Sequence, residues 1–238
     1  NLPKGDKKLL NAWAFYDWAN SVYTLTIASA VFPIFYEALF TDKSHYIDVF
    51  GMHLKNSALI SFITALAFLV VAFMSPLLSG IADYVGNKKS FMKFFCYLGA
   101  LSCMGLYWFD LDSIYSGLLF YFLGLLGYWG SLVFYNSYLP DIAFTEQQDA
   151  ISAKGYSLGY IGSVILLIIN LAMIMKPKLF GITGTDGEAA MKAMRYSFVM
   201  VGVWWILFSQ YTYYFLPKGN KKAGEAINKD IIFNGFKE

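Results

Sequence analysis

Residues 57–82, SALISFITALAFLVVAFMSPLLSGIA, form an apolar run without a single charged side chain. A helix needs roughly 20 predominantly apolar residues to cross the hydrocarbon core of a bilayer. The run is long enough to do so with a few residues to spare. It therefore predicts a membrane-spanning helix, and the rest of the chain repeats the pattern.

The composition extends this interpretation to the whole chain. Hydrophobic residues make up 58% of the 238 residues and charged residues only 14%, against about 25% charged in ordinary soluble domains. The predicted spans are residues 12–40, 57–82, 91–108, 114–139, 156–175 and 196–216. The sequence thus predicts an all-α polytopic membrane protein with six transmembrane helices. Residues 1–11 precede the bundle, residues 12–216 form it, and residues 217–238 begin a cytoplasmic linker.

The basic residues predict the orientation of these spans in the lipid bilayer. If the N-terminus lies inside, twelve of the 18 lysines and arginines fall in inner segments and six in outer loops. Cytoplasmic loops carry such an excess of positive charge. We therefore expect both termini in the cytoplasm. No dense basic patch is present, so a nucleic-acid partner is not expected.

Motifs for catalysis or for cofactor binding are absent from the sequence. It contains no nucleophile elbow, phosphate-cradling loop or zinc signature. Cys96 and Cys103 are seven residues apart, and His45 and His53 lack the spacing of metal ligands. The sequence therefore predicts no enzyme, no metal site and no cofactor.

Polar residues inside the predicted spans carry the functional signal, because burying them in lipid is costly. They recur at three- and four-residue spacing, which places them on one face of the first span and one face of the fourth. The candidates for a solute or proton pathway are Asp17, Asn20, Ser21, Thr24, Tyr128, Tyr135, Asn136 and Tyr138. For Asp17, a water-accessible cavity is the favoured environment, and a structural role at the membrane interface remains the alternative.

The fifth span opens with small residues at four-residue spacing, Gly155, Gly159 and Ser163. Such a row lets a neighbouring helix approach closely. We therefore predict a helix-packing role for these three positions. Packing is also the simpler explanation for most hydroxyl residues on the other polar faces.

The end of the run 57–82 and the turn after it combine glycines, an acid and two lysines, at Gly80, Asp83, Gly86, Lys88 and Lys89. Gly86 can adopt the left-handed conformation that ends a helix. Asp83 lies at the C-terminal end of its helix, where the macrodipole disfavours an anion, so we expect it to have an external partner. The pattern resembles the signature loop of the major facilitator superfamily. In that superfamily the partner of the acid belongs to the other half of the transporter.

Three further motifs carry a narrower resemblance. They are AWAFYDWANS at residues 12–21, NSYLPDIA at residues 136–143 and KGYSLGYIG at residues 154–162. In this order and spacing they resemble the autophagy-linked vacuolar amino-acid effluxers and their bacterial relatives. Members of that family have twelve spans. The resemblance implies that this chain is an N-terminal six-helix half, made of two inverted three-helix repeats, whose partner is a C-terminal half.

The resemblance implies a secondary transporter working by alternating access, in the plasma (inner) membrane of a bacterium. The only arginine is Arg195, near an outer span end, and no lysine lies deep in a span. This argues against anions and organophosphates and favours a small polar solute, such as an amino acid, with protons as a candidate coupling ion. The alternatives are a non-transporting scaffold or complex subunit, a half-size transporter that forms a homodimer, and, least favoured, an intramembrane enzyme.

Overall fold

The structure is a computed structural model that describes residues 2–40 and 45–218, without the side chains of residue 79 and residues 81–85. Its main elements follow in chain order. They are α1 (Lys7–Val22), a π-helical stretch (Tyr23–Ala30), α2 (Val31–Ala38), β1 (Tyr46–Val49), β2 (Met52–Lys55), α3 (Asn56–Val85), α4 (Lys88–Gly105), α5 (Ile114–Ser137), α6 (Leu139–Ile142), α7 (Thr145–Met175) and α8 (Asp186–Phe215). Short 3₁₀ turns at Leu106–Trp108, Leu111–Ser113 and Pro177–Phe180 lie between helices.

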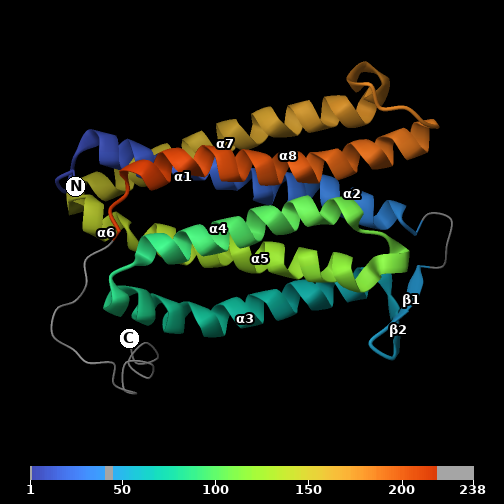
Figure 1. The fold of residues 1–238 in the computed structure, drawn as a ribbon, viewed down its shortest axis with the longest axis horizontal. Coiled ribbons are helices and arrows are strands. Elements are labelled where there is room, and N and C mark those ends of the chain that lie inside the picture. Colours follow the sequence, from blue (N-terminus) through green and yellow to red (C-terminus); the bar gives the residue numbers. More distant parts are fainter. Residues whose placement is uncertain (1, 41–44, 219–238) are drawn as a thin grey trace.

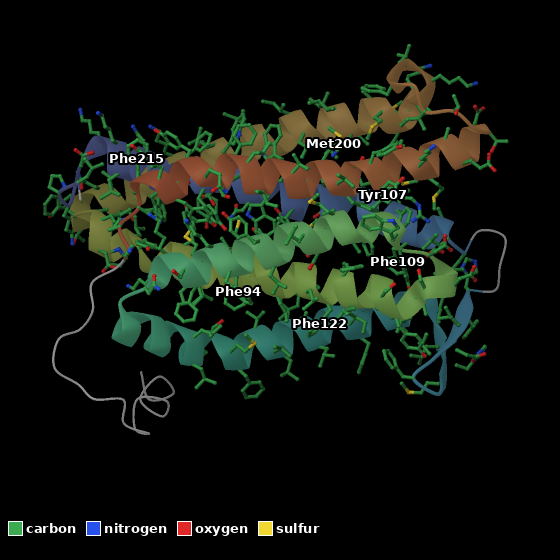
Figure 2. All side chains as sticks on the ribbon, viewed as in Figure 1. Phe94, Tyr107, Phe109, Phe122, Met200 and Phe215 are labelled. Atoms are coloured by element: carbon green, nitrogen blue, oxygen red, sulfur yellow. The ribbon has the colours of Figure 1, made fainter. Side chains whose placement is uncertain are left out.

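The long helices lie side by side in one bundle (Figure 1). Helix α1 packs against α7 and α8, while α4 packs against α5 and α8, and α3 covers α5. One end of the bundle carries the start of α1, α6, the start of α7 and the end of α8, and the opposite end carries the β1–β2 hairpin (Figure 1). In Figure 2, nitrogen and oxygen atoms gather mostly near the two ends of the bundle, whereas the outer side of α3 shows mainly carbon.

Four helical stretches of the described residues are long and apolar enough to cross a membrane. They are Lys7–Ala38, Asn56–Leu78, Leu111–Ile142 and Thr145–Met175. The all-α membrane class is therefore confirmed. Helices α4 and α8 lie in the same bundle but are not among these four, so the count of six spans stays a prediction.

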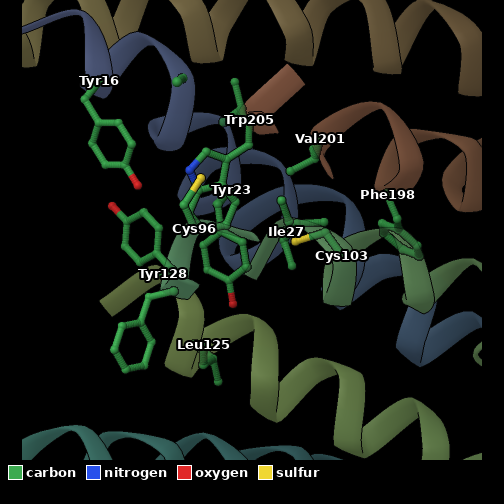
Figure 3. Close-up of a cluster of buried hydrophobic side chains, with 14 of the residues drawn as sticks. Tyr16, Tyr23, Ile27, Cys96, Cys103, Leu125, Tyr128, Phe198, Val201 and Trp205 are labelled. Carbon is green, nitrogen blue, oxygen red and sulfur yellow. The ribbon is translucent and has the colours of Figure 1, made fainter. Parts of the chain in front are cut away.

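The core of the bundle is aromatic. Tyr16 and Tyr23 from the first helical stretch, Phe198 and Trp205 from α8, and Phe134 from α5 are all almost completely buried. Figure 3 shows part of this cluster, with Cys96 and Cys103 of α4 among the rings. Both cysteines are buried and unpaired by disulfide. Aromatic packing between α1, α4, α5 and α8 thus sets the relative positions of the helices on which the polar faces lie.

Helices α7 and α8 extend beyond the apolar segments predicted as spans, beginning at Thr145 and Asp186 rather than at residues 156 and 196. Their first turns are polar and are stabilised by capping rather than by lipid. At the start of α8, Thr185 and Glu188 form a reciprocal capping box. The hydrogen bonds from Thr185 lower the pKa of the Glu188 carboxyl below its usual value.

The segment between the first two long helices forms a hairpin that the apolar pattern of the sequence does not predict. Strands β1 and β2 pair antiparallel, with Val49 opposite Met52. Phe50 and Gly51 both have positive φ, 52° and 72°, which is the geometry of a type I′ turn. On the exposed hairpin, His53 Nδ1 lies 2.7 Å from Asp48 Oδ1.

Candidate functional site

Asp17 of α1 and Tyr135 of α5 form the centre of the polar face. The Tyr135 hydroxyl donates a hydrogen bond of 2.9 Å to Asp17 Oδ2. The Tyr135 ring is stacked on Trp13, with centroids 4.3 Å apart, and Trp13 Nε1 donates to the Tyr135 backbone carbonyl. Asp17 is half-buried. The structure therefore joins two predicted pathway residues from distant parts of the chain and holds the carboxylate in one orientation.

The small residues of α7 bring that helix against the same face of α1. A Cβ placed at Gly155 would lie 2.5 Å from Asp17 Oδ2, and one at Gly159 would lie 2.5 Å from Ser21 Oγ. Ser163 donates to the Gly159 carbonyl within its own helix. The absence of side chains at the two glycines thus makes room for the polar groups of α1. Gly155 and Gly159 therefore lie where α7 contacts α1, and a packing role for the row that includes Ser163 stays a prediction.

A pocket of about 210 Å³ opens one helical turn beyond Asp17. Its lining is rich in hydroxyl groups and consists of Ser21, Thr24, Leu25, Ser29, Tyr128, Tyr156, Gly159, Tyr160 and Ser163. Tyr128 is held by stacking on Tyr23, with centroids 4.8 Å apart. Hydroxyl groups can both donate and accept hydrogen bonds. The pocket is therefore suited to a small solute with several polar atoms.

Three hydroxyl-bearing residues of the pocket were not among the predicted candidates. Tyr156 and Tyr160 belong to the KGYSLGYIG motif and are 68% and 72% exposed. Their spacing of four, followed by Ser163 three residues later, was a signal for a shared hydroxyl face. Ser29 lies in the π-helical stretch, where α-helical spacing does not apply, so no regular pattern pointed to it.

The remaining pathway candidates lie elsewhere. Asn20 is completely buried, and its Oδ1 accepts from Ser21 Oγ at 3.3 Å. Asn136 is exposed. Tyr138 is buried and donates to the Pro217 carbonyl at 2.8 Å, which fixes the segment that follows α8. None of the three lines the hydroxyl pocket, so a solute-binding role for them stays a prediction.

The two lysines of the glycine- and lysine-rich turn donate hydrogen bonds to the C-terminal ends of α5 and α8. Gly86 follows the last residue of α3 with φ of +65°. Lys88 Nζ donates to Asp141 Oδ2 at 2.9 Å and to the carbonyl of Ser137, the last residue of α5. Lys89 Nζ donates to the Leu216 carbonyl, at the end of α8. Both lysines thus offset the negative dipole ends of helices.

The same turn shows how burial affects one of these cations. Desolvation, together with Lys93 and Lys218 nearby, lowers the pKa of the Lys89 ammonium below its usual value. Gly80 lies within α3 and is half-buried. The side chain of Asp83 lies outside the described residues, so its external partner stays a prediction.

The short helix α6 connects this turn to the N-terminal segment. Lys4 Nζ donates to the Pro140 carbonyl, and the Gly5 amide donates to the Ile142 carbonyl, both at 2.7 Å. Asp141 Oδ2 accepts the hydrogen bond from Lys88 Nζ. The NSYLPDIA motif is therefore a junction between the chain start, the end of α5 and the start of α4.

Replacing Asp141 with asparagine should lower the free energy of unfolding of the full-length protein by about 1–2 kcal/mol. The Lys88 side chain is only 12% exposed, and a hydrogen bond to a charged group is worth about 1.5–3 kcal/mol. Because the Asp141 side chain is 49% exposed, solvent screening reduces that value. Thermal unfolding in detergent measures the effect. Asp112→Asn, an exposed acid in a 3₁₀ turn, is the control, and an equal shift in both variants would contradict the prediction.

Within residues 2–40 and 45–218, no group of three or more histidine, cysteine or acidic side chains could hold a metal ion. The site therefore consists of one carboxylate, aromatic hydroxyls and small polar residues. In its described part it holds no cation that would match an anionic solute.

The fold and the site together define an integral membrane protein with a polar pocket between its helices. The chain belongs to the family described as "Vacuole effluxer Atg22 like", whose sequence profile matches residues 5–238. The family resemblance drawn from the three motifs is thereby confirmed.

Curated relatives are consistent with this membership. The chain is 34% identical over 199 residues to "Uncharacterized MFS-type transporter YxiO" of Bacillus subtilis, covering 84% of this chain and 44% of the relative. It is 23% identical over 227 residues to "Autophagy-related protein 22-2" of Neosartorya fischeri, and the match covers 68% of this chain and 36% of the relative. The chain spans less than half the length of these relatives. No solved structure matches it.

Proposed function

We propose that this chain is one half of a secondary active transporter that moves a small polar solute by alternating access. The observation that carries the proposal is the Asp17–Tyr135 pair beside the hydroxyl-lined pocket, at the contact of α1, α5 and α7. The Bacillus subtilis relative is named as an MFS-type transporter. An ionisable group within a membrane helix typically marks a substrate or proton pathway.

The pocket chemistry favours a neutral or zwitterionic solute. Its hydroxyls can bind amide, carboxylate or amino groups, and Asp17 lies one turn away to accept a proton or an ammonium group. The one arginine of the chain is already engaged, since Arg195 pairs with Asp110 at 3.1 Å. An amino acid fits this combination of groups.

A complete transport site requires a second half. We propose that the chain forms two inverted three-helix repeats and faces a C-terminal six-helix half, either in the same polypeptide or in a second subunit. In this arrangement α1 and α5 are the first helices of the two repeats and border the central cavity. We further propose the plasma membrane of a bacterium as its location, with the α6 end of the bundle in the cytoplasm.

The test is transport by the full-length natural protein reconstituted into liposomes. Radiolabelled amino acids, supplied singly, should accumulate when a pH gradient is imposed and leak back when a protonophore removes it. Empty liposomes are the control. Folded, monodisperse protein that moves none of the twenty amino acids, with or without the gradient, would contradict the substrate class and favour a non-transporting scaffold.

A further inference from the structure

A second pocket lies on the bundle between α1, α7 and α8. It has a volume of about 480 Å³ and is lined by Asn11, Phe15, Lys154, Leu158, Phe208 and Tyr211. It shares no residue with the hydroxyl pocket. We call it the Phe15 groove. It lies toward the end of the bundle where α1 begins and α8 ends (Figure 1).

The walls of the Phe15 groove are aromatic and apolar. The Phe15 ring makes edge contacts with Phe208 and Tyr211, at centroid distances of 6.0 and 5.1 Å. Tyr211 is 45% exposed, and Leu207 and Tyr214, on the same face of α8, are 63% and 82% exposed. The groove therefore opens onto an outward-facing apolar surface, as a site for a hydrocarbon chain requires.

The mouth of the groove is cationic. Lys154 Nζ donates a hydrogen bond of 2.7 Å to Asn11 Oδ1, an acceptor that is neutral and so does not offset the charge of the ammonium group. Lys7 and Lys8 are exposed and precede Asn11 by four and three residues, which places them near the same helix face. The neighbouring acid, Asp6, caps α1 by accepting from the Lys8 and Leu9 amides. Lys154 therefore places a cation in the lining of the groove, and Lys7 and Lys8 add positive charge on the preceding turn of α1.

We propose that the Phe15 groove binds an anionic glycerophospholipid, with one acyl chain along Phe15 and Phe208 and the headgroup phosphate at Lys154. Basic sites between transmembrane helices on the cytoplasmic side bind anionic headgroups in this way. Lys154 lies two residues before the predicted span 156–175, and lipid headgroups lie at the depth where a span begins. A free phosphate ion would use the cations but leave the apolar walls empty.

The inference gives a role to two polar residues that the transport proposal does not use. Asn11 orients the Lys154 ammonium at the mouth, and the lipid would fill the space that separates α7 from α8 at this end. Because Gly155 follows Lys154 directly and contacts Asp17, an occupied groove would stabilise the helix contact on which the candidate site depends.

Native mass spectrometry of the full-length protein in detergent tests this proposal, with phosphatidylglycerol and phosphatidylcholine of identical chains as probes. The wild-type protein should bind phosphatidylglycerol more tightly. Lys154→Gln should weaken that binding about five-fold, the equivalent of about 1 kcal/mol per basic residue near an anionic surface. Lys154→Arg should retain it. Lys192→Gln, which removes an exposed lysine of α8 near the opposite end of the bundle, is the matched control.

A second variant tests the apolar wall. Leu158→Trp should fill the groove and weaken binding of both lipids, while Lys154→Gln weakens only the anionic one. Equal binding of the two lipids by the wild-type protein would overturn the proposal. So would unchanged phosphatidylglycerol binding in Lys154→Gln, or full competition by soluble glycerol phosphate, which would identify a simple anion site.

Discussion

Replacing Asp17 with asparagine in the full-length protein should abolish solute accumulation driven by a pH gradient. The asparagine Oδ1 can still accept the hydrogen bond that Tyr135 donates at 2.9 Å, so the local geometry is kept. An amide cannot take up a proton in this range of pH. The expected loss is on the order of 100-fold in initial rate, the scale associated with removing a positioned proton-transfer group.

The measurement is initial uptake into proteoliposomes, with and without an imposed pH gradient. Asp149→Asn, at an exposed position near the start of α7, is the control for loss of an acid and should transport normally. Tyr135→Phe keeps the ring stacked on Trp13 but removes the donor, so we expect a smaller loss. If Asp17→Asn accumulates solute as the wild type does, Asp17 has a structural role at the membrane interface instead.

The sequence was sufficient for the fold class because lipid leaves few options for a long apolar segment. Backbone groups in the bilayer must be hydrogen-bonded internally, so runs such as residues 57–82 can only be helices there. The ends of those helices were less predictable. The first turns of α7 and α8 are polar, and local capping by residues such as Thr185 extends them beyond the apolar segment.

Elements outside the regular apolar pattern escaped prediction. The hairpin at residues 46–55 depends on positive φ at Phe50 and Gly51, and the pair FG is a weak turn signal. The π-helical stretch Tyr23–Ala30 changes which residues share a face. Ser29 therefore lines the pocket although α-helical spacing does not predict it.

Within the site, the sequence predicted the polar helix faces but not which residues of different helices contact each other. The stripe on the first span includes Ser21 and Thr24, and both line the hydroxyl pocket; their role in a solute pathway stays a prediction. The pairing of Asp17 with Tyr135 joins residues 118 positions apart and depends on tertiary packing. Tyr138, three residues after Tyr135, bonds instead to the backbone after α8 because the helix ends there.

The position of Tyr128 and Tyr135 relative to α1 depends on how closely α5 approaches α4. The two helices meet at glycines, with no side chain between their backbones. A Cβ at Gly127 would lie 2.3 Å from both N and Cα of Gly99 and 2.7 Å from the Phe95 carbonyl oxygen. These are backbone atoms, which cannot rotate aside as a side chain can.

Gly127→Ala should therefore lower the free energy of unfolding by about 3 kcal/mol, the upper part of the range for overpacked interiors. Gly124→Ala, three residues earlier in α5, is the matched control, since its nearest neighbour is a Tyr23 ring atom at 3.5 Å, an ordinary contact. Alanine also has the higher helix propensity, by about 1 kcal/mol, so Gly124→Ala should be neutral or stabilising.

Thermal unfolding of the full-length protein in detergent, followed by tryptophan fluorescence, distinguishes the two variants. Trp205 packs over Gly99, so its environment should report the separation of α4 from α5. Since Tyr135 lies on α5 and Asp17 on α1, a shift of α5 should disturb their hydrogen bond, and Gly127→Ala should lose transport activity even where it still folds. Equal stability of the two variants would contradict the close backbone contact, and with it the arrangement of α5 that joins Tyr135 to α1.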